Sequence, residues 1–115
     1  RVISGEVLAR CSATQAPDDP CRRKEKRLFV LCFDSRKVYV VEPRSARVES
    51  VFQTGRGPHA FATDVRLSTS DTHAYGYLAH FTDSYLGVID LDQGSPTYGA
   101  FLATIGEPLA PRASK

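Results

Sequence analysis

This chain lacks several residue types and patterns, and each absence narrows its function. It contains no methionine and no tryptophan, and no apolar run approaches the ~20 residues needed to cross a bilayer. Its 15 lysines and arginines against 13 acidic residues leave a net charge of +2, too small to indicate nucleic acid or a membrane surface. We therefore predict no membrane span and no nucleic-acid partner.

The N-terminus also lacks the order of basic, apolar and small residues that marks a signal peptide. The chain begins at Arg1 and has no methionine, so we expect it to be a piece of a larger protein.

The motifs of common enzyme classes are missing as well. There is no glycine-rich phosphate loop, no Gly-x-Ser-x-Gly elbow and no Cys-x-x-Cys pair, and no two histidines have a short metal-ligand spacing. We predict no cofactor and no metal site, and the sequence leaves open whether the protein is an enzyme.

Strand patterns take the place of helical ones along the whole chain. No segment sustains a 3.6-residue apolar period between helix caps, whereas runs of apolar and β-branched residues recur between polar turns. We predict eight strands, at 2–9, 28–33, 38–41, 47–53, 59–67, 74–81, 86–91 and 98–105.

A 14-residue frame occurs twice, at 29–42 and 77–90, with a constant offset of 48 residues and no gap. Four strands in a unit of about 50 residues are typical of a β-propeller blade. The predicted fold class is all-β, with two four-stranded antiparallel blades of an incomplete β-propeller. An immunoglobulin-like sandwich also has short strands in this length but does not require a repeat.

The frame resembles the YVTN-type β-propeller repeat in its aromatic start, its central aliphatic residue and its closing acidic residue. In the first copy the matching residues are Phe29, Val38 and Val40-Val41-Glu42, and in the second they are Tyr77, Leu86 and Val88-Ile89-Asp90. The frame departs from the family at Leu31-Cys32 and Ala79-His80, where the family has Thr-Asn.

The segment between the two copies extends this resemblance. Gly55-Arg56-Gly57-Pro58-His59 matches the family's blade-to-blade connection, and Gly106-Glu107-Pro108 is one residue shorter. Gly55 and Gly57 allow a tight turn with positive φ, and Pro58 stiffens it. The resemblance covers Arg27 to Pro108 and implies blade one at 1–55 with an inserted Cys11 to Cys21 loop, blade two at 56–110 and a flexible tail at 111–115.

Two of the three cysteines bracket a loop rich in proline, aspartate and small residues. A Cys11–Cys21 disulfide would close this loop, and such bonds persist in oxidising compartments. We therefore predict an extracytoplasmic protein, whether periplasmic, secreted or at the cell surface; two unpaired thiols are the alternative. Cys32 lies in an apolar strand, and we expect it to be a small buried hydrophobe.

The histidines and carboxylates are the candidate site residues. His59 begins a strand and is a candidate to face the central axis of a propeller, and Asp64 is a second binding candidate on the same strand. We expect His73 to be exposed in the polar loop 68–73 and His80 to be a hydrogen-bonded core imidazole. A carboxylate site would draw on Asp64, Asp83, Asp90 and Asp92, whereas equivalent repeat positions favour a turn role for Glu42 and Asp90.

Five of the six residues from Arg22 to Arg27 are basic. No aromatic residues interrupt this run to stack on bases, so we expect a solvated loop before a strand.

The function predicted from these features is a non-catalytic β-propeller segment that acts as a binding or scaffold module. Its partners would be the missing blades or another protein chain. One alternative is a fragment of a propeller enzyme, either a lactonase-like hydrolase or a metal- or haem-dependent redox protein. Another is a small disulfide-bonded binding module that is complete in itself, as a two-sheet sandwich with a shared core.

Overall fold

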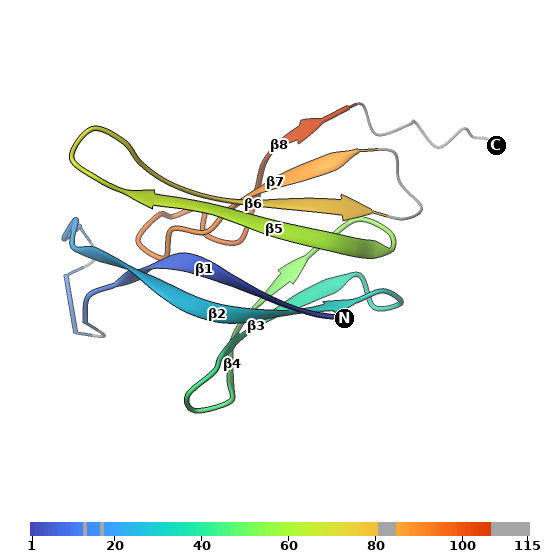
Figure 1. Cartoon of the computed structure of the whole chain (residues 1–115), viewed down its shortest axis with the longest axis horizontal. Helices are drawn as coiled ribbons and strands as arrows, with labels where there is room; N and C mark the ends of the chain where they lie inside the picture. The colour runs from blue at the N-terminus through green and yellow to red at the C-terminus, as the bar shows by residue number, and fades with distance from the viewer. Residues whose placement is uncertain (13, 17, 81–84, 107–115) are drawn as a thin grey trace.

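The computed structural model describes residues 1–12, 14–16, 18–80 and 85–106, and these form two sheets (Figure 1). Sheet A has the order β1-β2-β3-β4 and sheet B the order β5-β6-β7-β8, and every neighbouring pair is antiparallel. No helix occurs among the described residues, which confirms the all-β prediction. The strands are β1 (Val2–Arg10), β2 (Arg22–Cys32), β3 (Lys37–Glu42), β4 (Arg47–Gln53), β5 (Pro58–Leu67), β6 (Thr72–His80), β7 (Leu86–Asp90) and β8 (Phe101–Ile105).

The eight predicted strands are present, but three of their boundaries were wrong by more than one residue. β2 begins at Arg22 because β1 continues to pair with it as far as Arg10↔Arg22, so the basic run lies in a strand and not in a loop. His73 belongs to β6 and not to the preceding loop. β8 begins at Phe101 because backbone turns occupy the residues before it, with the Tyr98 amide donating to the Ser95 carbonyl.

The two copies of the frame have the same local structure. The β3–β4 pairing shifts register between Val40 and Val41, and the β7–β8 pairing shifts between Val88 and Ile89. These positions are equivalent in the repeat, so the same residue pattern produces the same bulge twice. The repeat is therefore present in the geometry of the sheets as well as in the sequence.

A single apolar core lies between the two sheets. Phe29 of β2 meets Phe61 of β5 with 4.7 Å between the ring centroids. Fully burying a side chain of this kind contributes about 1.5–3 kcal/mol. Such a shared core is compatible both with neighbouring blades and with a sandwich. Its members are Val7, Leu8, Ala9, Phe29, Leu31, Val38, Val40, Phe52, Phe61, Ala74, Leu78, Ile89 and Leu91.

Two glycines, Gly76 and Gly5, allow neighbouring side chains to pack closely against the backbone in this core. A Cβ on Gly76 would lie 2.5 Å from Cζ of Phe61, and one on Gly5 would lie 2.7 Å from Cγ2 of Thr63. A larger residue at either position would force Phe61 or β5 to move.

None of the described residues forms a helix long and apolar enough to cross a membrane.

Candidate functional site

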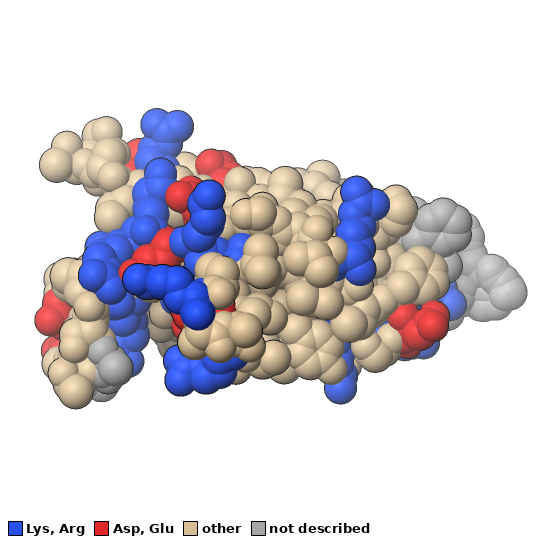
Figure 2. Space-filling view, turned by 60° about the horizontal axis from the view of Figure 1, so that its bottom comes forward, with Lys and Arg blue, Asp and Glu red and all other residues tan. Residues whose placement is uncertain are grey.

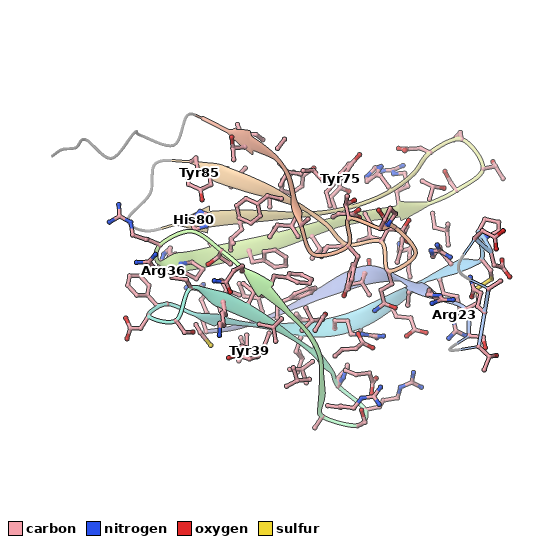
Figure 3. The ribbon with its side chains drawn as sticks, turned by 180° about the vertical axis from the view of Figure 1, so that it is seen from behind. Arg23, Arg36, Tyr39, Tyr75, His80 and Tyr85 are labelled. Atoms are coloured by element: carbon pink, nitrogen blue, oxygen red, sulfur yellow. A yellow bond between two sulfur atoms is a disulfide. The ribbon has the colours of Figure 1, made fainter. Side chains whose placement is uncertain are left out.

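Each sheet buries one face in the shared core and carries a second apolar face on its outer side. Residues alternate between buried and half-buried along β2, β3 and β6, as expected when only one side of a strand is covered. Figure 3 shows Tyr39 and Tyr75 on opposite sides of the molecule. The outer face of sheet A contains Leu28, Val30, Tyr39, Val41 and Val51, and that of sheet B contains Tyr75, Tyr77, Ala79, Leu86 and Val88.

The two sheets bury opposite faces of the same repeat. Phe29, Val38 and Val40 are fully buried in sheet A, whereas their equivalents Tyr77, Leu86 and Val88 are half-buried on the outer side of sheet B. The reverse holds for Leu78 and Ile89, which are fully buried, and their half-buried equivalents Val30 and Val41.

This reversal distinguishes two ways of packing a repeat. Two sheets related by a two-fold axis would bury the same repeat positions in both, as in an isologous contact. The observed contact places the front of one sheet on the back of the next, which is a heterologous relation. A heterologous contact leaves one face of each kind uncovered at the two ends of the stack.

The outer face of sheet A is positively charged at the end that carries the disulfide. Lys24 and Lys26 lie on the same side of β2 as Leu28 and Val30, and both are exposed. Glu6 approaches Lys24 at 3.8 Å. In Figure 2, basic side chains gather near this end, and the middle of the face is uncharged.

The outer face of sheet B carries carboxylates at the corresponding end, together with Arg66, whose Nε lies 3.8 Å from Asp71. His73 lies between two of them, with Nδ1 at 3.0 Å from Asp71 and Nε2 at 3.1 Å from Asp64, the latter an ion-pair contact without a well-aligned hydrogen bond. The His73 ring stacks on Tyr75 at 5.2 Å. The hydrogen bond to Asp71, followed by the interaction with Asp64, raises the pKa of His73 despite partial burial. The two carboxylates therefore favour the protonated form of His73 more than water does.

The structure does not bring His59 and Asp64 together. His59 is exposed at the irregularity in β5 between Pro58 and Ala60, and Asp64 lies five positions further along the same strand. Five residues of extended strand span roughly 16 Å, too far for both side chains to bind one ion. Within the described ranges, no group of three or more histidine, cysteine, aspartate or glutamate residues could hold a metal ion.

The turn between the sheets has the geometry expected of a glycine connection at one of its two glycines. Gly57 has a φ of 67°, while Gly55 is not in the positive-φ region. Gly55 instead donates its backbone amide to Nε2 of His80 at 3.0 Å. His80 is buried and hydrogen-bonded, as predicted, and Pro58 starts β5 as a buried residue.

The equivalent carboxylates Glu42 and Asp90 both bond the turns that follow their strands. Glu42 accepts the backbone amide of Ser45 at 2.8 Å, and this bond, followed by those from the Ser45 hydroxyl and Arg44, lowers the pKa of Glu42 to about 2. Asp90 accepts the amide of Asp92 at 2.9 Å and the hydroxyl of Thr97 at 2.6 Å. The turn role predicted for this pair is confirmed.

Asp92 contributes to the joint between the sheets. Its carboxylate accepts Nε of Arg22 at 2.8 Å and the amide of Gly94 at 2.8 Å. Asp83 lies outside the described residues, as do residues 107–115, which include Pro108 and the tail.

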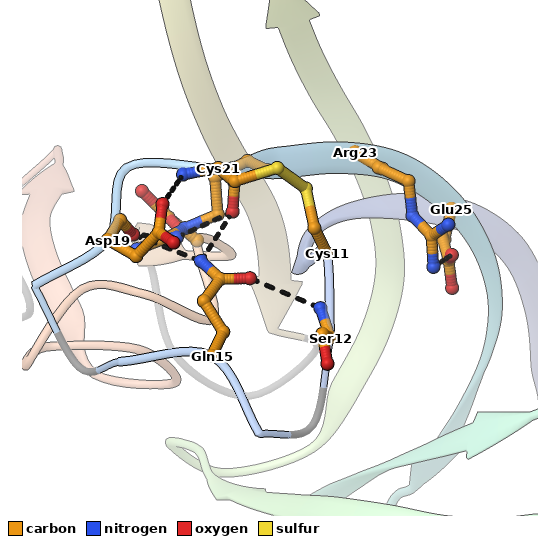
Figure 4. Close-up of a disulfide and its surroundings, with 9 residues drawn as sticks. Cys11, Ser12, Gln15, Asp19, Cys21, Arg23 and Glu25 are labelled. Atoms are coloured by element: carbon orange, nitrogen blue, oxygen red, sulfur yellow. Dashed lines mark hydrogen bonds and ion pairs between the residues drawn. A yellow bond between two sulfur atoms is a disulfide. The ribbon is translucent and has the colours of Figure 1, made fainter.

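Cys11 and Cys21 form a disulfide with 5.6 Å between their Cα atoms, as predicted (Figure 4). Gln15 holds the loop by donating Nε2 to the carbonyls of Asp19 at 3.0 Å and Cys21 at 2.8 Å. Cys32 is free and half-buried rather than buried, because it lies at the end of β2 on the outer side of sheet A.

The basic run takes part in ion pairs rather than forming a solvated loop. Arg27 is only 4% exposed and bonds Glu49 at 2.8 Å and Glu25 at 3.2 Å. Burial lowers the pKa of Arg27, but the bonds and charges of Glu49 and Glu25 outweigh it and leave that pKa raised. Because Arg27 and Arg22 both reach acidic partners, only part of the run contributes to an exposed positive surface.

The sequence indicated that each sheet has two apolar faces, but it did not identify the residues of the outer faces as a site. The signal was present, since the frames are apolar at both odd and even positions, which indicates strands that are covered on both sides. The sequence pattern alone does not show which of the two faces of each sheet is covered by the other sheet.

No family model matches the chain, and neither a curated protein nor a solved structure matches it.

Proposed function

We propose that this chain is a non-catalytic β-propeller segment, a binding or scaffold module whose two outer faces are covered by further sheets of the same kind. The observation that carries the proposal is the reversed burial of equivalent positions, such as Phe29 against Tyr77 and Leu78 against Val30. The covering sheets belong to missing propeller blades or to another protein chain.

The composition of the outer faces supports this proposal. Tyr75, Tyr77 and Val88 are half-buried on sheet B, and Val30, Tyr39 and Val41 are half-buried on sheet A. Contiguous apolar surface of this kind marks an interaction site in a soluble protein. An extracytoplasmic location is part of the proposal, since the Cys11–Cys21 disulfide is stable in oxidising compartments.

Sedimentation velocity over a range of protein concentrations tests the proposal. We expect residues 1–115 to associate as concentration rises, and we expect Tyr39→Lys or Tyr77→Lys to weaken this, because each places a charge on an apolar outer face. Leu67→Lys is the matched control, because Leu67 is a 43% exposed apolar residue near the end of β5 and outside both faces. A monomer at every concentration would overturn the proposal.

Elemental analysis of the purified protein tests the non-catalytic part. A stoichiometric metal that is lost in His59→Ala would establish the propeller-enzyme alternative instead. Unchanged metal content in both proteins, at trace level, is the result we expect.

A further inference from the structure

We infer that the outer face of sheet B binds the outer face of sheet A of a second copy of this chain, in a head-to-tail contact that repeats the contact between the sheets within one chain. The inference rests on the proposed function and identifies the partner of its two open faces. The residues of this contact are found by replacing each residue of an observed contact between sheets A and B with the residue at the equivalent position of the repeat.

The first contact with an equivalent at the outer faces is the aromatic pair at the centre of the core. Phe29 packs on Phe61 within the chain. Tyr77 is the equivalent of Phe29, and Val2 is the equivalent of Phe61, because Phe61 pairs with Leu78 and Val2 pairs with its equivalent Val30. Val2 is 60% exposed. Tyr77 of one copy therefore meets Val2 and Val30 of the next, where a smaller residue makes room for the tyrosine hydroxyl.

The close approach at Gly5 transfers in the same way. A Cβ at Gly5 would lie 2.7 Å from the Thr63 methyl group. Asp64 is the equivalent of Gly5, because Asp64 pairs with Tyr75 and Gly5 pairs with its equivalent Arg27. Ser4 is the equivalent of Thr63, because Thr63 pairs with Gly76 and Ser4 pairs with its equivalent Leu28. Ser4 lacks that methyl group. The contact between Asp64 and Ser4 therefore lacks the nearest of the atoms that crowd this position within the chain, and the Ser4 hydroxyl remains to hydrogen-bond the carboxylate.

Charge complementarity favours the same pairing. Ser4 pairs with Leu28, and Lys26 lies two positions along β2 on the same face. Two residues of strand span about 7 Å, within reach of a lysine side chain. The Asp64 carboxylate of one copy therefore lies near Lys26 of the next.

A contact between two identical faces lacks this match. Two copies of the sheet A face would bring Lys24 and Lys26 toward the same residues of the partner. Two copies of the sheet B face would bring Asp64 toward the same carboxylate of the partner, while Asp71 is already paired with Arg66. Like charges in close contact oppose both arrangements.

Mixing two single-face variants separates these possibilities. Val30→Lys disables the sheet A face and Tyr77→Lys disables the sheet B face, and both residues are half-buried in the isolated chain. Circular dichroism and urea midpoints report whether each variant folds. We expect each variant alone to lose association by at least about tenfold, and their equimolar mixture to form a one-to-one heterodimer in native mass spectrometry, because one intact face of each kind remains.

A charge exchange provides a second readout that does not depend on core-like substitutions. Asp64→Lys should weaken self-association of the full chain by about fivefold. Two double variants then test the exchanged pair: one chain carries Asp64→Lys and Val30→Lys and keeps only its sheet B face, and the other carries Lys26→Asp and Tyr77→Lys and keeps only its sheet A face. Their mixture should form heterodimers, because the exchanged charges again attract each other. Asp34→Lys is the matched control, because Asp34 is an exposed carboxylate in the turn 33–36 between β2 and β3 and outside the transferred contacts.

The outcomes distinguish this inference from the proposed function. Heterodimers in both mixtures support the head-to-tail contact. If one single-face variant still dimerises by itself and the mixture adds nothing, the contact is isologous and the inference is overturned while the proposed function stands. If the wild-type chain is monomeric throughout, the proposed function fails first and takes the inference with it.

Discussion

Sheets A and B share one frame, one strand order and one bulge position, yet their hairpin connections differ strongly. The β1–β2 connection, 11–21, is closed by a disulfide, whereas the β5–β6 connection is the four-residue turn 68–71. Conversely, the β3–β4 connection spans only 43–46, while the β7–β8 connection runs from 91 to 100.

The long connection 91–100 joins the two sheets in addition to the shared core, and the disulfide loop holds Arg22, which bonds that connection, through the carbonyls of Asp19 and Cys21. The amide of Leu8 donates to the carbonyl of Leu91 at 3.0 Å, and that of Gln93 donates to Leu8 at 2.9 Å. Arg22, directly after the disulfide loop, reaches Asp92 of the second long connection. Tyr98 of the same connection packs its ring edge-on against Phe52 of β4 at 5.5 Å.

The comparison separates two roles within the repeat. The shared frame builds a four-stranded sheet with two apolar faces, and the insertions strengthen the one joint that lies inside the chain. The transferred contacts at the outer faces lack these insertions, because the short turns occupy the corresponding places. We therefore expect the contact between copies to be weaker than the contact within a chain.

The largest expected difference in stability is between substitutions at the equivalent positions Phe29 and Tyr77. Phe29→Ala leaves a cavity in the covered core and should lower the free energy of unfolding by about 3–5 kcal/mol. Tyr77→Ala removes a half-buried ring at the same repeat position and should cost only about 1 kcal/mol, measured by urea unfolding of the dilute monomer. Equal losses at the two positions would contradict the reversed burial.

The next effect concerns the disulfide, which sheet B lacks. Replacing both Cys11 and Cys21 by serine should lower the free energy of unfolding by about 2–3 kcal/mol, because the unfolded chain regains the freedom of the closed loop. Urea unfolding measures this loss, and the wild-type protein in reducing agent should match the double variant. Cys32→Ser is the control. A double variant as stable as the oxidised protein would show that the loop contributes nothing to the β1–β2 hairpin.

The smallest effect compares His73 with its equivalent Glu25. Glu25 bonds arginines that stay charged, whereas His73 forms ion pairs with Asp71 and Asp64, and donates to both, only when it is protonated. The pKa of His73 is raised in the folded state, so its stabilising contribution is complete below the unfolded value of about 6.5 and disappears as pH rises through the folded pKa.

Nuclear magnetic resonance titration of the His73 ring should give a pKa above that of free histidine. The urea midpoint of the wild type should fall slightly over this pH range relative to His73→Asn, and His59→Asn should behave like the wild type. A His73 pKa at or below the free value would contradict the assignment.

Local residue patterns predicted much of the fold. The turns at 33–36, 43–46 and 54–57 separate the strands close to where they were predicted, because polar and glycine-containing segments interrupt apolar runs wherever the chain reverses. The start of β2 was missed, because charged residues such as Arg23 and Arg27 have low apparent strand preference when their partners are unknown. Their acidic partners Glu25 and Glu49 stabilise them in the folded sheet.

The candidate site was predicted less well than the fold. His59 and Asp64 were chosen by residue type, but they lie apart on β5, and Asp64 is paired with a histidine that had been expected in a loop. Cross-strand partners of this kind depend on register. Register is set by the pairing of whole strands and not by the residues near the site.

The sequence by itself determined that this chain forms two copies of one sheet whose strands are apolar on both sides. Only the tertiary structure decided which side of each copy is covered. Phe29 and Tyr77 occupy the same place in the frame, yet one is completely buried and the other only partly so. Burial depends on the neighbour that a face meets, and a local pattern contains no information about that neighbour.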